Sequence, residues 1–178
     1  MALCAPQAPW SEKEFLHRAK QQLAEQPMFL VLDGVQDPHN LGACMRSAEA
    51  SGVSAILIPK DHSASLSPVV HKVSCGASWR VPLVSVANLS RVLKNLQDLG
   101  YWTVGLDQAA DVSIYELDYA SPMVMIMGAE HQGIRRLTRK HCDFLAQIPM
   151  AGQVESLNVS VATGVCLFEA LRQRSASK

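Results

Sequence analysis

The sequence predicts an α/β fold in which a parallel β-sheet is covered by helices on both faces. Short apolar runs, such as residues 29–32 and 123–127, do not alternate with polar residues as a half-exposed strand would. Stretches with apolar residues at helical spacing separate these runs, which favours parallel strands joined by helices. In addition, three polar loops lead from an apolar run into a helical stretch, where open α/β sheets bind ligands.

Length and composition are typical of one soluble globular domain. The chain has 178 residues, of which 48% are hydrophobic and 18% charged, and this argues against intrinsic disorder. No apolar run approaches the roughly 20 residues that cross a bilayer, and the first residues do not resemble a signal peptide. The five cysteines are scattered and odd in number, so we expect reduced thiols in a cytoplasmic protein, with no membrane contact and no metal site.

Charge is balanced over the whole chain but not along it. The 16 Lys and Arg residues equal the 16 Asp and Glu residues, which argues against nucleic-acid binding through bulk charge alone. A basic cluster nevertheless lies near the C-terminal third, formed by Arg135, Arg136, Arg139, Lys140 and His141. A solvated helix face would have the same pattern, so the cluster alone does not identify a binding surface.

The predicted elements follow one another in a regular order. Residues 11–26 are predicted to form an amphipathic helix, with Phe15 and Ala19 on its apolar side and a capping box of Ser11 and Glu14. The strands predicted after it are residues 29–32, 55–58, 81–86, 102–106, 123–127 and 144–148. The helices predicted between and after them are residues 40–50, 68–75, 89–99, 133–141 and 159–172. This alternation is typical of parallel βαβ units.

The first polar loop runs from Asp33 to Arg46. Asp33 and Gly34 end the preceding strand, and Asn40 can cap the helix that follows. Arg46 lies nearly two helical turns beyond Asn40, which is not same-face spacing. The two side chains therefore converge only if Asn40 lies in the loop and Arg46 reaches back, and a plain surface arginine is the alternative.

The second polar loop carries Glu130 between Gly128 and Gly133. The spacing of the glycines resembles half of a phosphate-binding P-loop. However, Ile134 and Arg135 stand where that motif needs Lys and Ser or Thr, which argues against nucleoside triphosphate binding. An acid between two glycines is expected to lie close to backbone that a ligand can approach.

The third polar loop, residues 149–160, leads from the last predicted strand into the last predicted helix. It contains Ser156 and Asn158, and either of them could simply cap that helix. The two other polar loops at equivalent strand ends favour a shared site instead, because parallel strands end at the same edge of a sheet.

Together, the three loops resemble the motifs of the SpoU/TrmH branch of the SPOUT RNA methyltransferases. Residues 37–46 read Asp-x-x-Asn-x-Gly-Ala-x-x-Arg, like its first motif, and residues 127–133 read Met-Gly-x-Glu-x-x-Gly, like its second. Residues 148–162 read Ile-Pro-Met-x-Gly-x-Val-x-Ser-Leu-Asn-Val-Ser-Val-Ala, like its third. The resemblance covers residues 28–174 and is closest to members that methylate a guanosine ribose in large-subunit ribosomal RNA.

The resemblance implies a C-terminal trefoil knot in the α/β fold, S-adenosylmethionine as the cofactor, and a homodimer acting on RNA, with ribosomal RNA preferred over transfer RNA. Residues 27–174 would form the methyltransferase domain, after a linker and amphipathic helix over residues 1–26 and before a disordered tail over residues 175–178. The cofactor contacts that it implies are Leu106, Asp107, Gly128, Ile148, Met150, Ser156 and Leu157.

The implied reaction transfers a methyl group to a ribose 2′-oxygen, which requires alignment and acceptance of the hydroxyl proton. By resemblance, Arg46 contacts an RNA phosphate and acts in deprotonation or in stabilising the oxyanion, and Asn40 helps to place it. Glu130, Ser156 and Asn158 support the same site. The RNA contacts implied are Arg46, Arg135, Arg136 and Arg139. In a dimer, Arg46 could serve its own subunit or the partner.

The resemblance leaves several alternatives open. The ribosomal RNA members usually carry an N-terminal RNA-binding domain, to which residues 1–26 do not correspond. The chain is therefore interpreted as a catalytic-domain fragment or as a short relative closer to the transfer RNA enzymes. A knotted RNA-binding module without catalysis also fits the three loops. An unrelated flavodoxin-like nucleotide-binding domain is disfavoured, because the sequence has no complete phosphate motif.

Overall fold

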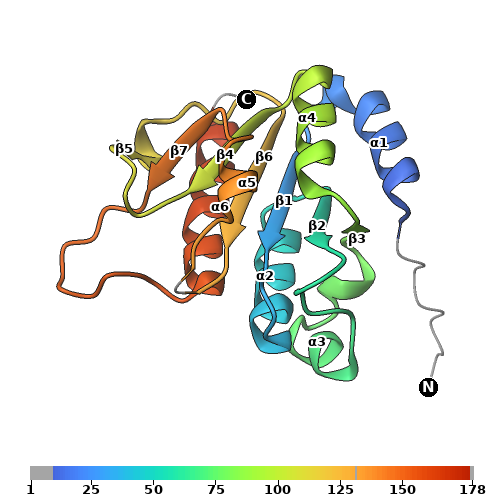
Figure 1. Ribbon diagram of the computed structural model, residues 1–178, viewed down its shortest axis with the longest axis horizontal. Helices are drawn as coiled ribbons and strands as arrows, with labels where there is room; N and C mark the ends of the chain where they lie inside the picture. The colour runs from blue at the N-terminus through green and yellow to red at the C-terminus, as the bar shows by residue number, and fades with distance from the viewer. Residues whose placement is uncertain (1–9, 131, 177–178) are drawn as a thin grey trace.

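The computed structural model describes residues 10–130 and 132–176. Its centre is a seven-stranded sheet in which every pair of neighbouring strands within the described residues is parallel. The strands are β1 (Met28–Asp33), β2 (Ala55–Pro59), β3 (Leu83–Val86), β4 (Trp102–Leu106), β5 (Val112–Ser113), β6 (Met123–Gly128) and β7 (Phe144–Gln147). They lie in the order β3-β2-β1-β6-β4-β7-β5 (Figure 1), and the predicted parallel α/β fold is confirmed.

Helices form a layer on each face of the sheet. One layer contains α1 (Glu12–Gln21), α4 (Leu89–Leu99) and α5 (Arg136–Arg139), and the other contains α2 (Pro38–Ala50), α3 (Pro68–Val73) and α6 (Val159–Ala176) (Figure 1). The short 3-10 helices are η1 (Leu23–Glu25), η2 (Ala77–Trp79) and η3 (Ile114–Glu116). Within the described residues, no helix is long and apolar enough to cross a membrane.

The central strand β1 explains why the apolar runs do not alternate with polar residues. Phe29 and Val31 belong to the core beneath α1 and α4, whereas Met28, Leu30 and Leu32 belong to the core beneath α2 and α6. Every residue of β1 is buried. A strand covered on both faces needs apolar residues at successive positions, so the continuous apolar pattern follows from the two helical layers.

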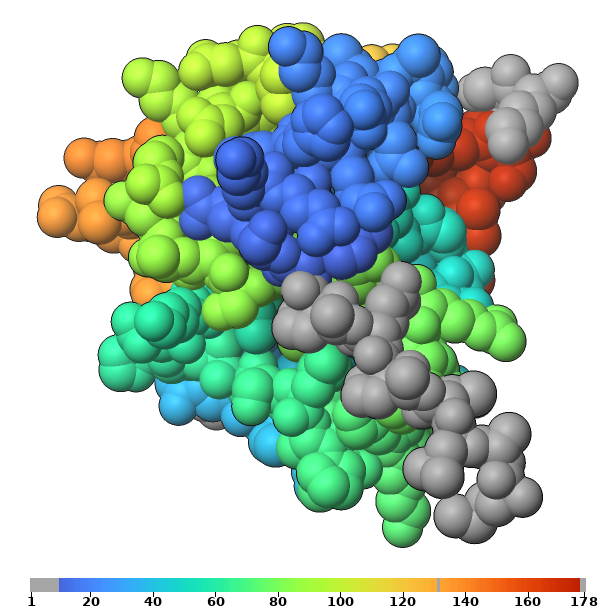
Figure 2. Space-filling view, turned by 90° about the vertical axis from the view of Figure 1, so that its right-hand side faces the viewer, coloured from blue at the N-terminus to red at the C-terminus, as the bar shows by residue number. Residues whose placement is uncertain are grey.

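Helix α1 belongs to the core that lies between the sheet and α4. The sequence prediction places this helix in a segment before the methyltransferase domain. Phe15 is fully buried, and its ring meets that of Phe29 edge-on with the centroids 4.9 Å apart. The Tyr101 hydroxyl donates a hydrogen bond to the Ala19 carbonyl oxygen at 2.8 Å. Figure 2 shows α1 lying against α4 on the surface of the molecule. The helix and the sheet therefore share one apolar layer.

Four elements show the main differences from the prediction. The helix expected over residues 133–141 is reduced to α5, because Gly133 has a positive φ of 63° and Arg135 has extended backbone. The helix expected over residues 11–26 ends at Gln21 and is followed by η1. Strand β5, with only two residues, is too short to produce an apolar run. Helix α6 continues to Ala176, into the tail expected to be disordered, while the rest of that tail and residues 1–9 of the expected linker lie outside the described residues.

The carboxyl ends of β1, β4, β6 and β7 lie at one edge of the sheet, and the polar loops of the three motifs leave from this edge. The loop from β7 to α6 bows away from the body of the molecule (Figure 1). The trefoil knot stays a prediction, because strand order alone does not establish how the chain passes through its own loops.

Candidate active site at the carboxyl edge of the sheet

Three side chains from the three polar loops form one hydrogen-bonded network. Asn40, in the first turn of α2, donates through Nδ2 to Glu130 Oε1 at 3.2 Å. Asn158, which precedes α6, donates through Nδ2 to the same Glu130 oxygen and to Asn40 Oδ1, the latter at 3.0 Å. The fold thereby brings three of the predicted catalytic residues into direct contact.

The helix caps explain how two of these amides reach the network. Asp37, and not Asn40, caps α2, where its carboxylate accepts the His39 N–H at 2.9 Å. This hydrogen bond holds the Asp37 pKa below its usual value and leaves the Asn40 amide free for the network. Asn158 has both of its proposed roles, since Oδ1 accepts the Ser160 N–H at 2.9 Å as an N-cap does while Nδ2 joins the network.

Glu130 is held by a tight turn after β6. Ala129 and Gly133 form an antiparallel bridge, and the Gly133 N–H donates to the Ala129 oxygen at 2.9 Å. A Cβ atom at Gly128 would lie 2.0 Å from the Gly133 carbonyl carbon, so a side chain cannot be accommodated there. The glycines of this loop therefore allow the close backbone packing that fixes the position of Glu130.

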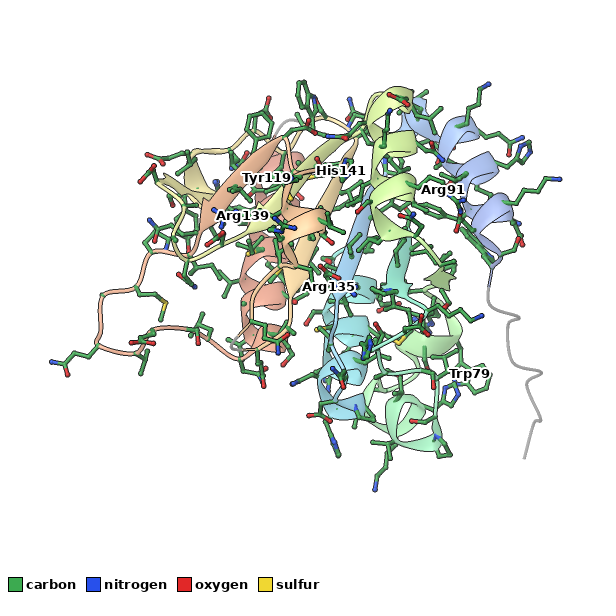
Figure 3. The ribbon with its side chains drawn as sticks, viewed as in Figure 1. Trp79, Arg91, Tyr119, Arg135, Arg139 and His141 are labelled. Atoms are coloured by element: carbon green, nitrogen blue, oxygen red, sulfur yellow. The ribbon has the colours of Figure 1, made fainter. Side chains whose placement is uncertain are left out.

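A buried ion pair fastens the same turn to β1. Asp33, the last residue of β1, is fully buried and accepts hydrogen bonds from the Arg135 backbone N–H at 3.1 Å and from Arg135 Nε at 2.6 Å. Arg135 Nη2 completes the ion pair. Figure 3 shows Arg135 near the lower end of β1. The sequence prediction missed this pair, which links residues far apart in the chain.

A cavity of about 510 Å³ borders the network, and we call it the α6 cavity because the first turns of α6 form part of its wall. The predicted cofactor contacts that line it are Leu106, Asp107, Gly128, Ile148, Ser156 and Leu157. Met150 is the exception: it packs against the core and does not line the cavity. Glu130 belongs to the cavity wall as well as to the network.

Sequence reasoning missed several other residues of the cavity wall, among them Gln108, Gln132, Gln147 and Ala162. Ala162 offered a usable signal, since it lies one helical turn after Asn158, whose carbonyl oxygen accepts its N–H at 2.9 Å. The glutamines offered none, because a polar side chain in a surface loop has no distinguishing pattern.

Residues 27–168 match the model of the SpoU rRNA Methylase family. The chain belongs to the SpoU family. The matched range includes the three polar loops and all the strands of the sheet.

Similarities to individual proteins in sequence and in fold agree with this family assignment. The chain is similar to the 23S rRNA (guanosine-2′-O-)-methyltransferase RlmB of Pseudomonas putida, with 56% identity over all of this chain and 71% of that protein. Its fold is similar to the SpoU methyltransferase AviRb from Streptomyces viridochromogenes in complex with the cofactor AdoMet (TM-score 0.78, 29% identity, 85% of this chain and 59% of that chain). It is also similar to the A. aeolicus TrmH/SpoU tRNA modifying enzyme (TM-score 0.78, 30% identity, 93% of this chain and 85% of that chain).

In this member of the SpoU family, Arg46 and Ser156 stand outside the hydrogen-bonded network. Arg46 is exposed, and its side-chain hydrogen bond within the described residues joins Nη1 to Cys75 Sγ at 3.5 Å. This agrees with its helical spacing from Asn40, which turns the two side chains to different sides of α2. Ser156 is exposed at the wall of the α6 cavity and makes no side-chain hydrogen bond within the described part of the chain.

The predicted RNA-binding arginines near α5 differ in whether their guanidinium groups form ion pairs. Arg135 is engaged by Asp33, and Arg139 pairs with Asp107 Oδ2 at 2.8 Å while lining the α6 cavity. Arg136 is exposed and makes no ion pair with any described residue. The basic cluster is therefore not a uniform solvated face, because two of its arginines fasten the loops of the site.

Three cysteines have the chemistry of structural residues: Cys44 and Cys166 are buried, and Cys142 is partly buried. Burial raises the pKa of the Cys142 thiol to about 12 and that of the Cys44 thiol to about 11. Burial likewise raises the pKa of Cys166 to about 12. A thiol with such a pKa stays protonated near neutral pH and is a poor nucleophile, so these three residues fill the core.

Proposed function

We propose that the protein transfers a methyl group from S-adenosylmethionine to the ribose 2′-hydroxyl of a guanosine in 23S rRNA. The observation that carries the proposal is that Glu130 belongs both to the hydrogen-bonded network and to the wall of the α6 cavity. A carboxylate oriented by two amides is thereby placed beside a cavity of cofactor size. The similarity to RlmB of P. putida supports the acceptor, and the similarity to AviRb with AdoMet supports the methyl donor.

The α6 cavity fits S-adenosylmethionine in size and lining. Its volume of about 510 Å³ lies within the range of small-molecule and cofactor sites. Leu106, Ile148 and Leu157 offer apolar surface for the adenine ring, and Gly128 presents backbone without a side chain. Bound there, the cofactor supplies an electrophilic methyl group on a sulfonium sulfur.

The reaction breaks the bond between sulfur and the methyl carbon, forms a bond between that carbon and the ribose 2′-oxygen, and releases the hydroxyl proton. Asn40 and Asn158 both donate to Glu130 Oε1, and Oε2 accepts no hydrogen bond from any described residue, so it can accept that of the ribose hydroxyl. Positioning the hydroxyl and receiving its proton are the two contributions that the transfer requires. The permanently charged guanidinium of Arg46 suits an RNA phosphate and the developing oxyanion.

We further propose a homodimer in which Arg46 serves the site of the second subunit. Helix α6 carries an apolar stripe of Val161, Val165 and Phe168, in which Val161 is 52% and Phe168 48% exposed. Residues at this spacing share one helix face, and an exposed apolar face is suited to burial against a second copy. The separation of Arg46 from the network of its own chain supports the arrangement, because a second subunit can supply the missing cation.

The proposal is tested by incubating the protein with methyl-labelled S-adenosylmethionine and 23S rRNA, followed by digestion of the RNA to nucleosides. We expect the label in 2′-O-methylguanosine, and a rate about 100-fold lower for Glu130→Gln. Glu25→Gln, an exposed carboxylate on η1, is the matched control and is expected to keep the wild-type rate. Label in a base-methylated nucleoside, or no label at all, refutes the proposal. Faster transfer to tRNA would assign instead the substrate class named for the A. aeolicus relative.

A further inference from the structure

A second cavity, of about 310 Å³, lies at the same edge of the sheet. We call it the β1 cavity, because its wall begins with the last residue of β1 and the loop that follows. Its polar lining residues are Asp33, Gln36, His62, Gln132 and Arg135. None of the three network residues, Asn40, Glu130 and Asn158, lines it.

The β1 cavity adjoins the α6 cavity. Ala129, Gln132 and Gly133 line both of them, so the turn that carries Glu130 forms the wall between the two spaces. The loop after β1, which lines the β1 cavity through Gln36, continues into the first turn of α2 and reaches the network through Asn40. Two ligands seated in the two cavities would therefore lie on either side of the turn that carries Glu130.

Some polar side chains of the β1 cavity are already hydrogen-bonded to other residues of the chain, and others make no such bond within the described residues. The Asp33 carboxylate is buried and saturated by Arg135, so it builds the wall and is not available to a ligand. The side-chain amides of Gln36 and Gln132 are exposed and make no hydrogen bond with any other described residue. Each amide offers both donors and an acceptor.

We propose that the β1 cavity binds the base of the acceptor nucleoside and that Gln36 and Gln132 read its hydrogen-bonding edge. The inference rests on the proposed function and deepens it. A volume of about 310 Å³ is at the small end of ligand sites, which suits a single splayed base. Free neutral amides that both donate and accept match the edge of guanine, which carries donors beside an acceptor, and they match a phosphate poorly. With the base in the β1 cavity, the ribose lies at the network and faces the α6 cavity.

The charges around the β1 cavity agree with this placement. Arg135 lines both the β1 cavity and a neighbouring groove of about 400 Å³. That groove also contains Lys60 and Arg136, which are exposed, together with the acidic Asp61. An RNA backbone leaving the base pocket would thus pass over cations, while Gln36 and Gln132 present neutral amides inside the pocket.

The test compares acceptor bases in one RNA. The guanosine that the wild-type protein methylates is first mapped on 23S rRNA, and a fragment containing it is prepared with either guanosine or inosine, which lacks the 2-amino group, at that position. We expect the wild-type kcat/KM to favour guanosine by about tenfold or more. In the double variant Gln36→Ala/Gln132→Ala, kcat/KM for guanosine falls by about tenfold or more, and that for inosine falls less, because inosine has already lost the contact to the 2-amino group and keeps only the rest of the edge.

Calorimetric titration with S-adenosylhomocysteine accompanies each kinetic measurement. Its affinity is expected to stay within about twofold of wild type in the single variant Gln36→Ala, because Gln36 lines only the β1 cavity, whereas Gln132 lines both cavities. Gln21→Ala, an exposed glutamine on α1, is the matched control and keeps the preference for guanosine.

The possible outcomes separate a failure of this inference from a failure of the proposed function. A preference for guanosine that is unchanged in the double variant overturns the inference alone, and so does an equal loss for both bases, which would mean a structural role. A wild-type protein that methylates both fragments equally well likewise overturns base reading by the amides. A wild-type protein that binds S-adenosylhomocysteine but transfers nothing overturns the proposed function, and the inference falls with it.

Discussion

Removing the Arg135 side chain is predicted to destabilise the fold by about 2 to 3 kcal/mol. Breaking a buried ion pair by deleting one partner costs about 3 to 5 kcal/mol, because the remaining charge is left uncompensated. Here Asp33 is fully buried and loses its hydrogen bond from Arg135 Nε, but it keeps the one from the backbone N–H at residue 135. The Arg135 side chain is 45% exposed, so water can partly replace it, which lowers the expected cost.

Urea unfolding of Arg135→Ala measures this cost as a change in midpoint at constant m-value. Arg136→Ala is the control, and we expect it to stay within about 0.5 kcal/mol of wild type because Arg136 is exposed and unpaired within the described residues. The double variant Asp33→Asn/Arg135→Ala should regain at least half of the loss, since its buried group is neutral. If Arg135→Ala costs no more than Arg136→Ala, the ion pair does not hold the β6 turn and the reasoning is refuted.

Three further predictions concern catalysis, assembly and acid stability. Arg46→Ala is expected to abolish methyl transfer while leaving the calorimetric affinity for S-adenosylhomocysteine intact, and a collapse of that affinity would contradict an RNA-side role. Phe168→Glu places a charge on the exposed stripe of α6, so light scattering should give a mass near the chain's 19.4 kDa for the variant and about twice that for wild type; equal masses would argue against this interface. Hydrogen bonds from Arg172, and then from Gln173, lower the Glu169 pKa from 4.5 to about 2, so Glu169 contributes stability above pH 4.5 that is lost as the pH falls toward 2. Denaturant midpoints of Glu169→Gln should therefore drop less than those of wild type between pH 5 and about pH 2.5, and parallel profiles would contradict this.

Local patterns predicted the sheet well wherever strands are buried on both faces. β1 and β6 lie at the centre and are apolar at nearly every position, and their runs identified them within one residue at each end. β5 was missed because two residues at the edge of the sheet leave no pattern. The stretch around α5 was predicted too long, because its composition suits a helix. Its conformation is decided instead by Gly133 and by the distant partner Asp33.

The sequence predicts which residues belong to the candidate site, but it does not predict which of them contact one another. The motifs identified Asn40, Glu130 and Asn158, but their direct contact depends on the register of the sheet, which pairs Asp33 with Gly128 so that two of the loops start side by side. The contact of Arg46 with Cys75 and the β1 cavity could not be predicted. Both depend on how α3 and the loop after β2 pack against residues distant in sequence.

The central claim is that the cavity built by these loops holds the methyl donor, and calorimetric titration with S-adenosylhomocysteine tests it most directly. We expect one molecule bound per chain with a micromolar constant, on the order of −8 kcal/mol, for wild type. Ala162→Trp, which fills the α6 cavity, should abolish this binding, whereas Ala24→Trp, an exposed residue of η1, should preserve it. Absence of binding to the wild-type protein, or undiminished binding to Ala162→Trp, would contradict the account.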